Sequence, residues 1–401
     1  MIRDFWPFCA DPWRPYSAVM EMGDVVVIDV QGLDALIAVL GELGYDTRGP
    51  VVRNGAIMPG VVAGVADFPV GHHDEQAPGH YRLEHHDDET VFGWAVGPGS
   101  WKAELFPPIQ ELWCATVNAD DVSFTEPDLL STAIAIIGAR PCELAALHVL
   151  DRVLRDGSRP DQRYTARRDG AFVVVAECGT PAATCFCTSM GTGPGADVGF
   201  DLALTELDNG DGHRFVVRVG TERGAEVLAQ LSTTEATPPD LEARSQTLTT
   251  AVEAMTRVLP VEGLAALLAR NIDHPRWDEV AKRCLSCGNC TLVCPTCFCS
   301  DVRDTTTLSG EIHRQRSWAS CFDLDHSYLH GGPVRASTSS RYRQWLTHKL
   351  STWWDQFGTS GCVGCGRCIA WCPVGIDLTE EATAIRNSDG AVRTSSEGRG
   401  S

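Results

Sequence analysis

Two cysteine runs with one shared spacing constrain this chain more than any other feature. Each run reads Cys-x2-Cys-x2-Cys-x3-Cys-Pro; the first extends from Cys284 to Pro295 and the second from Cys362 to Pro373. In iron–sulfur proteins this spacing supplies three thiolates to one [4Fe–4S] cluster and the fourth thiolate to a neighbouring cluster. Zinc sites are built instead from two Cys-x2-Cys pairs. The two runs therefore predict two [4Fe–4S] clusters.

The spacing also predicts which cysteines share a cluster, because the fourth thiolate of each run belongs to the cluster of the other run. The first cluster would be held by Cys284, Cys287, Cys290 and Cys372, and the second by Cys362, Cys365, Cys368 and Cys294. Cys294 and Cys362 are 68 positions apart, too far for a compact ferredoxin, in which a short hairpin joins the motifs. The arrangement resembles the helical ferredoxins, in which helices carry the motifs. Two adjacent clusters favour electron transfer over catalysis.

The composition indicates a globular protein of a reducing compartment. A length of 401 residues predicts two or three domains, and a hydrophobic content of 43% is ample for their cores. The first residues contain no apolar segment of signal-peptide length, and nowhere do 18 apolar residues follow one another. We therefore expect neither export nor a membrane span, and a cytoplasmic location. The 17 cysteines agree with this, because clustered thiols in a reducing compartment are usually metal ligands or reactive groups.

The acidic charge is concentrated in the first two thirds of the chain. The whole chain has 33 Lys and Arg against 53 Asp and Glu; residues 261–401 hold 15 of each kind, which leaves 18 basic and 38 acidic residues in 1–260. Such a surface repels nucleic acid and anionic membranes, so neither is an expected partner. An acidic docking face for another protein and a merely solvated surface both fit this charge.

The hydrophobic pattern predicts an α+β fold, with an N-terminal mixed α/β domain followed by a helical two-cluster domain of the α-helical ferredoxin type. The boundary is expected at Thr237, where polar residues and prolines precede helical periodicity. The domains would span 1–237 and 238–386, followed by a disordered tail at 387–401. The expected strands are 24–29, 79–83 paired with 91–97, 134–138, 171–176, and a hairpin of 202–207 with 214–219; the expected helices are 33–43, 144–153, 241–258, 263–270, 277–283 and 339–354.

Three further patterns bear on function. Neither Gly-x-Gly-x-x-Gly between a strand and a helix nor Gly-x4-Gly-Lys-[Ser/Thr] occurs, so no dinucleotide or triphosphate site is predicted. The histidine pairs at 72–73 and 85–86 are candidate metal ligands, but their acidic surroundings in predicted loops favour exposed side chains. Four basic residues before the second run would form either a docking or cluster-tuning patch or a solvated helix face: Arg335, Arg341, Arg343 and Lys349.

Four segments taken together resemble one protein family. They are Ile137–Glu143, Cys185–Pro194, Cys294–Cys299, and Arg341–Gln344 with His348 and Lys349. They resemble the 4Fe–4S dicluster β subunit of cytoplasmic NAD(P)-linked [NiFe] hydrogenases, also called sulfhydrogenases, a family that includes one subunit of anaerobic sulfite reductase. The resemblance covers about residues 75–380, with Glu143 where the family usually has Asp. It implies an electron bridge between a flavin- and NAD(P)-binding subunit and the hydrogenase small subunit, in a hetero-oligomer, without catalysis by this chain alone.

Nine cysteines lie outside the two runs: Cys9, Cys114, Cys142, Cys178, Cys185, Cys187, Cys297, Cys299 and Cys321. Those at 142, 178, 185 and 187 follow the ends of two apolar strands or lie in the adjoining loop, where α/β sheets commonly place their sites. They are a candidate third cluster site, and Cys142, at a helix start beside an arginine, would have a lowered pKa. The repeated Thr-Cys-Phe-Cys at 184–187 and 296–299 also allows a site between the domains that includes Cys297 and Cys299. Buried structural thiols are the alternative.

Three classes of function are open on the sequence alone. An electron-transfer subunit is preferred, because the chain contains two cluster motifs and no nucleotide site. A catalytic subunit would use the third site to reduce a small acceptor such as sulfur or sulfite. An oxygen sensor would need a module that reads DNA or another protein, and no such motif is apparent. The sequence separates neither the hydrogenase branch from the sulfite reductase branch nor NADH from NADPH.

Overall fold

The centre of the molecule is a mixed eight-stranded sheet. The computed structural model describes residues 20–118, 121–129, 132–208 and 212–397. The sheet order is β12-β1-β11-β10-β9-β8-β2-β3. The bounds are β1 Val25–Asp29, β2 Asp46–Arg53, β3 Ala56–Val61, β8 Ile134–Ala139, β9 Phe172–Ala176, β10 Leu202–Asp208, β11 His213–Val219 and β12 Thr234–Glu235. Strands β10, β9, β8 and β2 are parallel, and antiparallel strands flank them on both sides.

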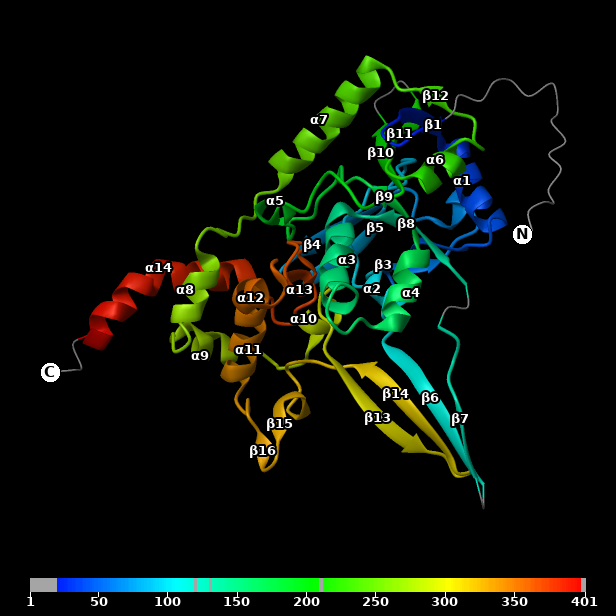
Figure 1. Ribbon diagram of the computed structural model, residues 1–401. Coiled ribbons are helices and arrows are strands. Elements are labelled where there is room, and N and C mark those ends of the chain that lie inside the picture. Colours follow the sequence, from blue (N-terminus) through cyan, green and yellow to red (C-terminus); the bar gives the residue numbers. More distant parts are fainter. Residues whose placement is uncertain (1–19, 119–120, 130–131, 209–211, 398–401) are drawn as a thin grey trace.

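Helices cover both faces of this sheet (Figure 1). Because side chains alternate along a strand, Ala135 and Ile137 of β8 face one core, with α1 (Val30–Glu42) and α6 (Glu222–Leu228), whereas Ile136 faces the other, with α3 (Pro141–Leu154) and α4 (Gln162–Gly170). This buried parallel centre matches the apolar runs in the sequence. The expected strands at 24–29, 134–138 and 171–176 and the 202–207 hairpin are confirmed.

A second sheet joins the two halves of the chain. Its four antiparallel strands have the order β13-β14-β6-β7, with bounds β6 Ile109–Asn118, β7 Asp121–Thr125, β13 Ser300–Thr306 and β14 Glu311–Trp318. The β13–β14 hairpin is the segment between the cysteine runs, and it projects as a long ribbon in Figure 1. The expectation of a wholly helical ferredoxin domain is therefore not confirmed, because the C-terminal region contributes strands to a sheet that it shares with residues 109–125.

The expected pairing of 79–83 with 91–97 is wrong. Strand β5 (His80–His85) pairs with β4 (His72–Ala77), and residues 91–97 are not a strand. The main-chain amides of Val91 and Phe92 donate to the carboxylate of Glu206 instead, which holds this apolar segment against the sheet without a ladder. A two-residue hairpin, β15 (Tyr328–Leu329) with β16 (Gly332–Pro333), lies further along the chain.

The C-terminal region packs short helices around the cysteine runs. After α2 (Lys102–Leu105) and α5 (Cys187–Met190), the helices are α7 Pro238–Ala254, α8 Leu264–Arg270, α9 Arg276–Ala281, α10 Asn289–Leu292, α11 Thr338–Thr347, α12 Trp353–Phe357, α13 Arg367–Ala370 and α14 Leu378–Glu397. Thr237 caps α7, whose first residue is Pro238, so the expected boundary coincides with a helix start. The expected helix at 339–354 is α11 and α12 joined by a π-helical turn at His348–Thr352. No helix in the described ranges is long and apolar enough to cross a membrane.

The segment expected to be a disordered tail is mostly helical. Helix α14 continues to Glu397, and residues 398–401 lie outside the described part of the chain. Its first turns are held by Glu381, which is fully buried and accepts hydrogen bonds from Arg276 Nε and Arg283 Nη2, each at 2.5 Å. These contacts fix α14 beside α9, at the residue that precedes Cys284.

We expect Glu381→Ala to lower the free energy of unfolding by roughly 1–3 kcal/mol, less than for a wholly buried ion pair because both arginines are partly exposed and regain water. Chemical denaturation monitored by circular dichroism measures this loss. The neighbouring Glu380 is exposed, so Glu380→Ala is the control and should change stability little. Equal effects of the two substitutions would contradict the role given to the buried pair.

Candidate metal centres

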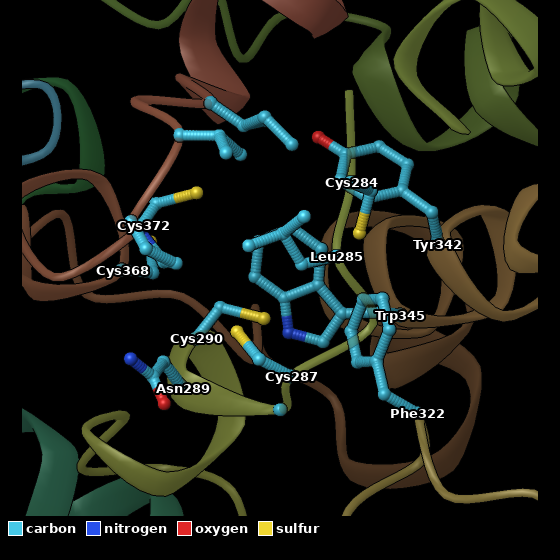
Figure 2. A pocket seen from close by; sticks show the side chains of 14 residues that line it. Cys284, Leu285, Cys287, Asn289, Cys290, Phe322, Tyr342, Trp345, Cys368 and Cys372 are labelled. Atoms are coloured by element: carbon cyan, nitrogen blue, oxygen red, sulfur yellow. The ribbon is translucent and has the colours of Figure 1, made fainter. Parts of the chain in front are cut away.

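The first centre is a cavity whose walls combine both cysteine runs. Cys284 follows α9, Cys290 lies on α10, and Cys372 follows α13. The cavity has about 420 Å³ of open space and is lined by these three residues together with Cys287. Figure 2 shows the four cysteines around this hollow, with Cys368 beside Cys372. The fold thus brings the last cysteine of the second run to the first three of the first run.

The wall of the first centre also holds two buried donors without a partner. The hydroxyl of Tyr342 and the indole N–H of Trp345 make no hydrogen bond, and both residues line the cavity from α11. They are three positions apart, so they lie on one face of the helix. A buried donor left unpaired costs about 1–3 kcal/mol, and cluster sulfurs accept hydrogen bonds from such groups. The residues present therefore fit a sulfur-rich anionic group.

The spacing of the sulfurs differs from that of a zinc site. Within the described ranges, the group of three His, Cys or carboxylate ligand atoms that lie within 4.8 Å of one another is His73, His86 and Asp88, and it includes no cysteine. Four sulfurs bound tetrahedrally to zinc at about 2.3 Å would lie about 3.8 Å apart. Among the described residues no three cysteine sulfurs lie within 4.8 Å of one another, which suits a group larger than one ion.

The second set of cysteines adjoins the first. Burial raises the pKa of the Cys368 thiol well above its usual range, and the nearby Cys362, Cys365 and Cys294 raise it further. Cys294 acts in the same direction on the pKa of both Cys362 and Cys365. Lys349 Nζ contacts both Cys294 Sγ and the carbonyl of Gly361, the residue before Cys362, so Cys294 of the first run lies beside the start of the second. Cys368 also lines the first cavity, which places it between the two sets.

Two of the three lysines in the chain are buried beside the second set. Lys349 Nζ donates to Cys294 Sγ at 3.2 Å, to Thr296 Oγ1 at 3.0 Å and to the Gly361 carbonyl at 2.8 Å. Lys102 Nζ donates to the carbonyls of Cys294 and Cys297 at 2.9 and 3.0 Å. Burial opposes the charge of Lys349, but the sulfurs of Cys294, Cys297 and Cys362 outweigh it and raise its pKa well above the usual range.

The contact between Lys349 and Cys294 predicts that Lys349 raises the redox potential of the cluster at the second centre. Because a cation favours the more negative, reduced state of a cluster, Lys349→Met should lower the midpoint potential of the cluster at the second centre, by on the order of 50 mV for one charge-assisted hydrogen bond. Redox titration followed by electron paramagnetic resonance measures the shift. Lys282 is exposed, so Lys282→Met is the matched control; an equal shift in both variants would contradict the direct contact.

The four cysteines of the candidate third site line one cavity. Cys142, Cys178, Cys185 and Cys187 surround about 320 Å³ of open space, together with Cys365 of the second run. The expectation of a lowered pKa at Cys142 is wrong, because burial raises the pKa of this thiol well above its usual range. The adjacent Arg140 instead directs its guanidinium to main-chain carbonyls.

The remaining cysteines do not join that cavity. Cys297 and Cys299 do not line it, and they lie near Cys294, Lys102 and Lys349; a site built from both Thr-Cys-Phe-Cys segments is therefore not supported. Cys321 lies near Cys299 and Cys290, Cys114 lies on β6, and Cys9 is outside the described residues.

The histidine pairs and the basic cluster also differ from expectation. His72 and His73 lie on β4 and are half-buried, whereas His85 and His86 are exposed as expected. His73 Nε2 lies 2.8 Å from Asp88 Oδ2, a contact that explains the spacing of this group without a metal. Of the basic cluster, Lys349 and Arg341 are buried, so the interpretation as a solvated face is wrong for these two.

Comparison with known proteins agrees with this geometry. Residues 283–376 match the family model for a 4Fe–4S dicluster domain, the segment that holds both cysteine runs. The chain is 34% identical over 254 residues to sulfhydrogenase 2 subunit beta of Pyrococcus furiosus, which covers 63% of this chain and 73% of that protein. No solved structure matches the chain. The chain therefore belongs to the family of sulfhydrogenase β subunits, with a 4Fe–4S dicluster domain that contains both cysteine runs.

Proposed function

We propose that this chain is the electron-transfer subunit of a multi-subunit hydrogenase, and that it connects a flavin- and NAD(P)-binding subunit to the hydrogenase small subunit. The observation that carries the proposal is the mixing of the two runs: Cys372 lines the first cavity with cysteines of the first run, and Lys349 Nζ contacts both Cys294 Sγ and the carbonyl of Gly361, next to Cys362. Two [4Fe–4S] clusters, held by the eight motif cysteines, would supply one-electron transfer when bound. The chain itself holds the ligands, shields them and sets their charge environment.

The two centres differ in their access to the surface. Cys287 is exposed, and Leu285 and Val374 on the wall of the first centre are 64% and 38% exposed. At the second centre, Cys294 and Cys362 are buried. Exposed apolar side chains beside a redox centre suit a protein contact. We place electron exchange with one partner subunit at the exposed edge of the first centre.

The absence of a nucleotide motif supports a division of labour. The sequence has no phosphate-binding glycine motif, so hydride exchange with NAD(P)H is assigned to a separate flavin subunit. The name of the Pyrococcus relative, a β subunit of a sulfhydrogenase, favours the hydrogenase branch over the sulfite reductase branch. Identification of the polypeptides that co-purify with the native chain distinguishes the branches.

Assays of the isolated chain test whether flavin and NAD(P)H chemistry belong to a separate subunit. Reconstituted without oxygen, it should neither bind flavin nor oxidise NAD(P)H, because the sequence contains neither of the phosphate-binding glycine motifs. Its clusters should become reduced by NAD(P)H once the flavin subunit is added, as followed by the loss of visible absorbance. Tight flavin binding by the purified chain, seen as flavin fluorescence on release, would overturn the assignment and favour a catalytic subunit.

A further inference from the structure

Four cysteines outside the two runs converge on one largely enclosed cavity. Cys142, Cys178, Cys185 and Cys187 line it, and its open space of about 320 Å³ is comparable to the 420 Å³ of the first centre. We infer that these four thiolates bind a third iron–sulfur cluster, of the [4Fe–4S] type, next to the second centre. Four cysteine ligands are the usual protein complement of such a cluster.

The fold explains why these cysteines meet. Strands β8 and β9 are parallel neighbours, so their carboxyl ends lie at the same edge of the sheet. Cys142 comes three residues after the end of β8, and Cys178 two residues after the end of β9. Cys185 and Cys187 come from a loop held to the second run, where the amide of Phe186 donates to the Gly364 carbonyl at 2.8 Å. Sheet edge and loop together close the cavity.

The burial of the four cysteines and the apolar residues around them suit a bound cluster. Cys142, Cys185 and Cys187 are each no more than 8% exposed, and much of the remaining wall is apolar: Ala95, Val96, Pro141, Pro181 and Pro194. Among the described residues no three of their sulfurs lie within 4.8 Å of one another, whereas the four sulfurs of a single zinc site would lie about 3.8 Å apart.

One buried guanidinium group at the cavity supplies positive charge that an anionic cluster needs, and a second lies nearby, paired with a buried carboxylate. Arg140, 1% exposed, borders the cavity, and among the described residues no carboxylate lies within ion-pair distance of it. Arg367 is also 1% exposed, and its Nη1 has no hydrogen-bond partner although Nη2 pairs with Glu143 Oε1 at 2.5 Å. Its charge acts on both Cys142 and Cys365. A buried anion is tolerated only with such compensation.

The third site lies in series with the two motif centres. Cys365 belongs to the second set and lines the third cavity, and Cys185 Sγ lies 4.0 Å from the Cys365 carbonyl oxygen. Cys368, in the same run, borders the first cavity. A third cluster would extend the path for electrons inward from the exposed Cys287. This conducting role rests on the proposed function, whereas the binding of metal does not.

Iron and sulfide analysis of the full chain tests the site. After anaerobic reconstitution the chain should hold about twelve iron and twelve sulfide, against about eight for two clusters. Cys142→Ser combined with Cys185→Ser should hold about eight and keep the spin-coupled signals of the motif clusters. Cys114 lies on β6, away from the cavity, so Cys114→Ser is the control and should hold twelve.

The count in the unmodified chain decides the matter even if the double variant does not fold. About eight iron there, or near-stoichiometric zinc with eight iron, would overturn the third cluster. A loss of two iron instead of four in the double variant would overturn the [4Fe–4S] type. Failure of the proposed function would look different: twelve iron would be present, but no electrons would pass to or from a partner subunit.

Discussion

Replacing Cys372 with serine is expected to remove the cluster bound by Cys284, Cys287 and Cys290, although 82 positions separate Cys372 from Cys290 in the sequence. The reason is that these four cysteines line the same cavity. The converse change, Cys294→Ser, should perturb the cluster bound by the second run. Anaerobic iron analysis should show a loss of about four iron in each variant, and electron paramagnetic resonance should show the surviving cluster without its spin-coupled neighbour.

The same variants should stop transfer through the complex. Hydrogen-linked reduction of NAD(P) should be lost, while dye reduction at the hydrogenase active site stays largely intact, because the break lies between two working sites. Cys114→Ser again serves as the control. If Cys294→Ser removed only the cluster of its own run, each cluster would be closed within one run, and the exchange of ligands between runs would be refuted.

The close packing of the second run on the third site predicts a large effect at Gly364. Gly364 has φ +67°, and a Cβ there would lie 2.6 Å from the Phe186 carbonyl oxygen and 2.7 Å from Cys187 Cα. We expect Gly364→Ala to lower the free energy of unfolding by about 2–4 kcal/mol, from the left-handed backbone and the main-chain clash together. The iron content of the second and third centres should fall with it.

A comparison with Gly263 separates the cost of the left-handed backbone from the cost of the clash. Gly263 has φ +65° and no atom within 4 Å of a Cβ position, so Gly263→Ala carries the backbone cost of about 1–2 kcal/mol alone. Denaturation midpoints and iron content measured in parallel give the difference. Equal losses in the two variants would show that the contact between the second run and the 184–187 loop is not close.

The sequence indicated more about the cysteines than about their surroundings. The motif spacing predicts Cys372 with the first run and Cys294 with the second, because ligand exchange between paired motifs is a property of the spacing itself, and Cys372 does line the first cavity with cysteines of the first run. The convergence of Cys142 and Cys178 was predictable because two buried apolar strands preceded them, and parallel strands end at one edge. Both inferences used strong local signals.

The hairpin between the runs was missed because its pattern is polar. Strands β13 and β14 carry charged residues such as Asp304 and Arg314, which pair at 2.7 Å on an exposed face. The hairpin pairs with β6, about 200 residues earlier in the chain. Its mostly polar residues show no hydrophobic alternation from which a strand could be predicted. The 91–97 segment gave the opposite error: its apolar residues predicted a strand, but they are buried in an irregular segment.

The lysines and aromatic donors could not be assigned from sequence either. Lys349 was one of four basic residues near the second run, and nothing local distinguished it from its neighbours on the helix. Its burial follows from the fold of the 294–296 and 361 segments around its Nζ atom. The same holds for Trp345 and Tyr342. Their sequence positions predict ordinary core residues, and only the structure shows that both line the first cavity (Figure 2).

Rapid freeze-quench spectroscopy of the purified native complex tests electron bridging most directly. NAD(P)H is mixed with the complex in the absence of hydrogen, and the reduction of the clusters of this chain is followed by electron paramagnetic resonance over one turnover. The account predicts that both motif clusters become reduced no more slowly than the complex turns over, and that Cys372→Ser blocks transfer to the hydrogenase small subunit. Turnover that proceeds while these clusters stay oxidised, or that survives Cys372→Ser, would contradict the bridging role.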